Sequence, residues 1–121
     1  MRRILLLLVL ATTTAIGQPA LQSPAEFLGY ELGDRFTRHD RVVAYYRHVD
    51  EAMPNVQVTQ YGETFEHRPL VYAIVASAEN FQRLEQIRTD NLKRAGMMEG
   101  TPSANKVAIV WLSYNVHGNE A

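Results

Sequence analysis

The chain contains no cysteine, so no disulfide supports its fold and no lipid can be attached through an N-terminal cysteine. It also lacks an excess of charge, because 12 Lys and Arg residues balance 13 Asp and Glu residues without a block of one sign. This balance excludes the basic surface expected of a protein that binds nucleic acid or an anionic membrane. With 121 residues, 46% of them hydrophobic, the chain is expected to form one globular domain at most.

Long hydrophobic runs are absent except at the N-terminus. There, two arginines precede the apolar residues 4–10, and the small residues Ala15 and Gly17 follow. This order is typical of a signal peptide, so residues 1–17 are predicted to be removed and residues 18–121 to form the mature chain. The apolar run is too short to span a bilayer, so no stable membrane insertion is expected after cleavage. The alternative is an N-terminal membrane anchor, but the pattern favours a secreted or periplasmic protein.

The first part of the mature chain is predicted to contain one helix. Residues 18–35 carry two prolines and two glycines, which favours an extended segment at the surface. Thr37 offers an N-cap hydroxyl, and apolar residues at helical spacing continue almost to Pro54. His39 and His48 lie nine positions apart, too far to meet at one metal, so they are interpreted as surface histidines.

A hairpin and a second helix are predicted next. Residues 56–61 alternate as a half-buried strand does, and residues 70–75 can pair with them. Ser77 can cap the following helix, and Gly96 stands where a C-terminal cap is expected. The apolar stripe of that helix comprises Phe81, Leu84, Ile87 or Arg88, and Leu92.

Residues 107–112 are apolar without alternation, which predicts a strand covered on both faces of a sheet, with Trp111 in the core. The order helix, hairpin, helix and buried strand indicates an α/β fold. Two helices and three strands are too few to cover a central strand on both faces. We therefore expect the chain to be part of a larger domain.

A histidine and a carboxylate follow this predicted strand, at the place where open α/β sheets bind ligands. His117 and Glu120 stand three residues apart, with Gly118 between them to permit a tight turn. Imidazole nitrogen and carboxylate oxygen both bind zinc, so these two residues are the predicted ligands of a Zn²⁺ cofactor. A solvated loop without metal is the alternative, because His-x-x-Glu is a common spacing. Ala121 excludes the related pattern His-x-x-Glu-His.

Two segments carry a resemblance to a known family. Residues 108–121, AIVWLSYNVHGNEA, resemble the strand and first zinc-binding loop of the carboxypeptidase A-like zinc metallocarboxypeptidases. Residues 61–70, YGETFEHRPL, are similar to the early hairpin of that family. The resemblance extends from about Phe36 to the last residue. His67 stands where the family commonly has glycine, and Asn119 stands where digestive members have arginine, which leaves substrate preference open.

The resemblance implies the N-terminal part of a mixed-sheet α/β/α domain in which His117 and Glu120 bind zinc. The third ligand, a histidine, and the general-base glutamate are expected beyond residue 121, so no catalytic or substrate-binding residue is assigned. The implied activity is zinc-dependent hydrolysis of peptide or protein substrates, releasing C-terminal residues; this chain alone is expected to be inactive. The alternative is a small exported, non-catalytic module that binds a peptide or partner. Glu66 and Arg68 are interpreted as a surface ion pair.

Overall fold

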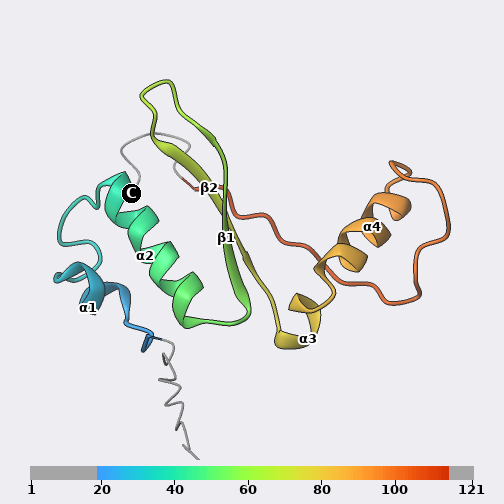
Figure 1. Cartoon of the computed structure of the whole chain (residues 1–121), viewed down its shortest axis with the longest axis horizontal. Helices are drawn as coiled ribbons and strands as arrows, with labels where there is room; N and C mark the ends of the chain where they lie inside the picture. The colour runs from blue at the N-terminus through green and yellow to red at the C-terminus, as the bar shows by residue number, and fades with distance from the viewer. Residues whose placement is uncertain (1–18, 115–121) are drawn as a thin grey trace, which may run out of the picture.

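The computed structural model describes residues 19–114. The predicted signal peptide and the predicted zinc ligands His117 and Glu120 lie outside the described residues. The described part is a small mixed α/β structure with four helices and a two-stranded antiparallel sheet, which confirms the α/β class (Figure 1). In chain order the elements are α1 Pro24–Leu28, α2 His39–Ala52, β1 Val56–Glu63, β2 Pro69–Val75, α3 Ala78–Phe81 and α4 Leu84–Arg94. Within residues 19–114, no helix is both long enough and apolar enough to cross a membrane.

The segment before α2 contains the short helix α1, so the prediction of an extended segment was wrong at this point. Pro24 occupies the first turn, where its missing N–H is not needed and its fixed φ favours the helix. The Ser23 hydroxyl accepts a hydrogen bond from the Glu26 N–H at 3.3 Å, and the Glu26 carboxylate accepts one from the Ser23 N–H at 2.7 Å. The Ser23 hydroxyl also donates to the Glu26 carboxylate at 2.7 Å, and this bond, together with the one from the Ser23 N–H, lowers the pKa of Glu26.

Helix α2 begins at His39, and its N-cap is Arg38, which makes no side-chain capping bond. The predicted cap at Thr37 was therefore wrong. Thr37 is buried, and its hydroxyl accepts a hydrogen bond from the Tyr30 hydroxyl at 3.0 Å, so it is engaged away from the helix end. The helix ends at Ala52, shortly before Pro54, as the sequence predicts.

Strands β1 and β2 form the predicted hairpin. Their antiparallel register runs from Val56 opposite Val75 to Glu63 opposite Pro69, with an irregularity between Gln60 and Gly62. The turn is closed by a hydrogen bond from the His67 N–H to the Thr64 carbonyl at 2.9 Å. His67 has a φ of 58°, the left-handed conformation that favours glycine.

The predicted second helix is two helices. The Ser77 hydroxyl accepts the Asn80 N–H at 3.2 Å and starts α3, which confirms the predicted cap. Arg83, with φ −127° and ψ 29°, leaves the helical region and separates α3 from α4. Gly96 has a φ of 71° and its N–H bonds to the Lys93 carbonyl at 3.1 Å, which confirms the predicted C-terminal cap. Ile87 is buried and Arg88 is exposed, so the stripe runs through Ile87.

Residues 107–112 do not form the predicted buried strand. In the described part of the chain, β1 and β2 pair only with each other, and nothing covers the apolar side chains that follow Ala108. Trp111 is 76% exposed, so its predicted place in the core was also wrong. The physical reason is that an apolar run becomes a strand only where a sheet edge accepts its backbone bonds.

The packing is layered at one end of the molecule. Helix α1 packs on α2 and α2 packs on β1, whereas α3 and α4 follow β2 on the side of the hairpin away from α2 (Figure 1). Val43 of α2 and Val56 of β1 are buried, and Ile87 is the buried apolar residue of α4. The small core between α2 and the hairpin therefore fixes the position of α2, and residues of α2 line the groove described below.

Candidate functional site

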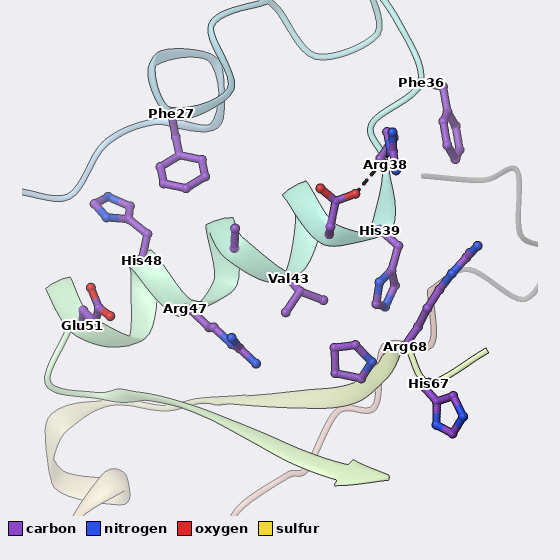
Figure 2. Close-up of a pocket in the computed structure, with 13 residues that line it drawn as sticks. Phe27, Phe36, Arg38, His39, Val43, Arg47, His48, Glu51, His67 and Arg68 are labelled. Atoms are coloured by element: carbon purple, nitrogen blue, oxygen red, sulfur yellow. Dashed lines mark ion pairs between the residues drawn. The ribbon is translucent and has the colours of Figure 1, made fainter. Parts of the chain in front are cut away.

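A groove of about 840 Å³ crosses α2 between the N-terminal segment and the hairpin turn (Figure 2). Its apolar lining comes from Phe27, Phe36, Val43, Ala44 and Pro69. Its polar lining comes from Arg38, His39, Asp40, Arg47, His48, Glu51, His67 and Arg68. Because eight of the thirteen lining residues are polar or charged, the groove is more polar than an ordinary small-molecule pocket.

One side of α2 supplies the groove's hairpin-facing wall. His39, Val43 and Arg47 follow each other at four-residue spacing, and Figure 2 shows all three pointing toward the hairpin. This spacing is visible in the sequence, and reading it as a ligand-binding face would have found the groove. The helix itself was predicted from a different set of apolar residues at helical spacing, so this face was missed.

Three arginines line the groove, and they differ in their partners. Arg38 pairs with Asp40 at 3.3 Å, and Arg68 pairs with Glu66 at 2.7 Å. The Glu66–Arg68 pair is exposed on both sides, which confirms its interpretation as a surface ion pair. Arg47 has no ion-pair partner among residues 19–114. Its guanidinium is therefore the cation of this groove that can bind a carboxylate without breaking an ion pair.

His39 and His48 lie on different sides of α2. His39 points toward the hairpin, whereas His48 points toward Phe27 of the N-terminal segment (Figure 2). Both side chains are half-buried, so neither is a freely solvated surface histidine. In the described range, no three side chains of His, Cys, Asp or Glu are grouped so that they could hold a metal ion.

The surroundings of His48 assign its tautomer. Its Nε2 accepts a hydrogen bond from the Gln22 N–H at 3.0 Å, so the neutral ring carries its proton on Nδ1. The Phe27 ring stacks on the imidazole, with centroids 5.1 Å apart and planes inclined by 24°. His48 therefore accepts a hydrogen bond through Nε2 while its ring packs against the apolar ring of Phe27.

A second polar cluster joins α4 to the segment after it. Asp90 is 7% exposed, and its carboxylate accepts hydrogen bonds from the Ser103 N–H at 2.9 Å and from the Ser103 hydroxyl. These bonds lower the pKa of Asp90. Arg94 donates to the carbonyls of Ser103 at 2.7 Å and Asn105 at 2.6 Å. The cluster positions the start of the apolar segment, and no sequence signal pointed to it, since Asp90 and Ser103 are 13 residues apart.

The predicted zinc ligands His117 and Glu120 lie three and six positions beyond Tyr114, the last described residue. The structure therefore gives no geometry for them. No protein-family model, curated protein or solved structure matches the chain.

Proposed function

We propose that this chain is the N-terminal part of the catalytic domain of a zinc metallopeptidase resembling the carboxypeptidase A family. His117 and Glu120 are two of its three zinc ligands, and the full-length enzyme releases C-terminal residues from peptide or protein substrates. The observation that carries the proposal is the His-x-x-Glu spacing directly after an apolar strand-like segment, preceded in the proper order by the hairpin motif of residues 61–70.

The backbone of His67 supports this proposal. The family commonly has glycine at this position of the turn, and glycine is favoured where φ is positive. In this chain the residue is histidine, yet its φ of 58° is one that glycine adopts without strain. Although the residue type differs, the turn therefore has the backbone conformation that the family's glycine would provide.

The exposed apolar segment also supports the proposal. Ile109, Val110, Trp111 and Leu112 are each at least 64% exposed in the described part of the chain. Soluble proteins seldom leave such a continuous apolar surface uncovered. In a larger α/β/α domain, further strands and helices would cover these side chains and make the segment a central strand.

The donor set fits zinc, because a neutral imidazole and a carboxylate are both among its ordinary ligands. Bound zinc supplies Lewis-acid polarisation of the scissile carbonyl and lowers the pKa of its bound water. The role of this chain would be to supply the His117 nitrogen and the Glu120 oxygen, which follow the apolar segment in the sequence. The Asp90–Ser103 bonds restrain that segment at its other end.

The proposal is tested by calorimetric zinc titration and a peptide-hydrolysis assay on the full-length protein. His117→Ala and Glu120→Ala should each weaken zinc binding and abolish hydrolysis. His39→Ala is the matched control, since it removes a histidine from α2, and it should keep both zinc affinity and turnover. Wild-type zinc affinity and turnover in full-length His117→Ala would exclude the assignment.

The groove favours a second candidate, a non-catalytic module that binds a peptide or partner. Its apolar lining and the guanidinium of Arg47 suit a peptide that carries a carboxylate beside an apolar side chain. Arg47→Gln would weaken peptide binding in this case but would leave zinc-dependent hydrolysis unchanged. A full-length protein that binds peptides through Arg47 and lacks hydrolysis would favour the module over the enzyme.

A further inference from the structure

The N-terminal strap, residues 22–28, is attached to α2 by side chains of that helix. The Gln22 N–H donates to His48 Nε2 at 3.0 Å, and the Tyr45 hydroxyl donates to the Gln22 carbonyl at 3.2 Å. Both polar groups of the Gln22 backbone are therefore bound by α2. This leaves the start of the strap dependent on His48 and Tyr45.

Phe27 attaches the other end of the strap. Its ring stacks on the His48 imidazole at 5.1 Å and meets the Tyr45 ring edge-on at 5.4 Å. The Arg41 guanidinium donates to the Phe27 carbonyl at 3.1 Å. His48 thus contacts the strap twice, through a hydrogen bond to Gln22 and through the Phe27 ring.

The strap has little stability of its own. Helix α1 contains five residues and buries none of them, and its capping bonds run between Ser23 and Glu26 within the strap. A helix this short is not stable in water without tertiary contacts. Whether the strap lies on α2 therefore depends on the contacts made by Arg41, Tyr45 and His48.

We propose that the strap is docked on α2 only while His48 is neutral, and that protonation of His48 releases it. In the neutral ring Nε2 is an acceptor, whereas in the imidazolium both nitrogens are donors. Protonation therefore turns the contact with the Gln22 N–H into one donor facing another. Histidine is the side chain whose charge ordinarily changes between about pH 5 and 8. Because Phe27 and His48 line the groove, release of the strap widens the groove at that end.

His48 is the residue of this region whose protonation would release the strap. Besides His48, the charged and titratable groups that line the groove or contact the strap are Glu26, Arg38, His39, Asp40, Arg41, Tyr45, Arg47, Glu51, His67 and Arg68. His67, which also lines the groove, lies on the hairpin turn and contacts Glu63 at 3.4 Å. Among residues 19–114, only His48 bonds directly to the strap backbone through a nitrogen that protonation converts to a donor.

NMR titration of the chain between about pH 8 and 5 tests this proposal. The hydrogen-exchange protection factor of the Gln22 amide should fall by about fivefold, which corresponds to the net free energy of one ordinary hydrogen bond. The fall should have the same midpoint as the His48 ring shifts. This wild-type measurement needs no variant, so it decides the proposal even if a substitution prevents folding. Unchanged Gln22 protection through the titration of His48 would refute the strap mechanism.

Two variants sharpen the test. His48→Gln keeps a neutral acceptor but cannot titrate, so the pH dependence of Gln22 protection should disappear. His39→Gln removes a histidine from the other side of the same helix, and the pH dependence should persist. A pH step that survives in His48→Gln and disappears in His39→Gln would assign the effect to the wrong histidine and overturn the proposal.

Discussion

The Asp90 carboxylate on α4 accepts hydrogen bonds from both the backbone and the side chain of Ser103, which lies 13 residues later. These two bonds, together with those from Arg94 to the carbonyls of Ser103 and Asn105, fix the loop after α4 to the helix. The start of the apolar segment of residues 107–112 is thereby attached to a rigid element rather than to the hairpin.

Asp90 should make the free energy of unfolding depend on pH in the acidic range. The bonds from Ser103 hold its pKa below the ordinary value of about 3.9, so the folded state favours the charged carboxylate. The stabilisation is complete above that ordinary value and is lost as pH falls through the lower folded value. Asp90→Asn should be less stable than wild type at pH 7, and the difference should shrink below about pH 4. Urea unfolding at several pH values measures it, and a constant difference would contradict the linkage.

Ile87 should be the residue of α4 that is most sensitive to truncation. Its side chain is 8% exposed, so Ile87→Ala removes buried methyl groups and should cost about 2 to 4 kcal/mol. Arg88→Ala is the matched control, because its exposed pair with Glu85 contributes little, and its thermal midpoint should stay close to wild type. Equal losses in the two variants would show that α4 is not packed through Ile87.

A side chain at position 96 should lower the stability of the chain. Its φ of 71° places it in the left-handed region, so Gly96→Ala should destabilise the chain by about 1 kcal/mol. Gly62→Ala is the control, because an added Cβ there would meet only the Leu70 Cδ1 at 3.8 Å, an ordinary contact. Chemical denaturation of both variants measures the difference, and an unchanged midpoint for Gly96→Ala would refute the capping role.

His67 should be replaceable by glycine. His67→Gly relieves the left-handed strain, partly offset by the entropy of glycine, for a net gain of about 0.5 to 1 kcal/mol. The exposed contact to Glu63 at 3.4 Å contributes little to the comparison. His67→Val should instead lose about 1 kcal/mol or more, since a β-branched residue fits this conformation poorly. Comparable stabilities for Gly and Val would mean that the turn rearranges.

The parts of the fold predicted correctly are those set by neighbouring residues. The alternation of residues 56–61, the cap at Ser77 and the glycine at position 96 act over a few positions and appear where expected. One failure was local, because the capping box of Ser23 and Glu26 that starts α1 was missed. The other failures involve partners outside the predicted element. Thr37 loses its capping role because Tyr30 donates to its hydroxyl, and residues 107–112 lack a neighbouring strand within the described part.

The candidate site, too, has one part that a local pattern could have predicted and another that depends on tertiary contacts. The four-residue spacing of His39, Val43 and Arg47 is a local pattern, and it could have predicted one wall of the groove. The opposite wall comes from Arg68 and the hairpin turn, whose approach to α2 is a tertiary contact that no spacing encodes. His117 and Glu120 stay predictions, because they rest on a motif and lie beyond the described residues.

The exposure of residues 109–112 has a consequence for handling the protein. The run from Val107 to Tyr114 contains no charge and no proline and is rich in β-branched and aromatic residues, which is the composition of an aggregation-prone segment. Lys106 is the charged residue that immediately precedes it. A chain in which these side chains stay uncovered should precipitate as its concentration rises and should be kept soluble by chaperones that bind extended apolar peptides. Soluble yield would therefore report how completely this segment is buried.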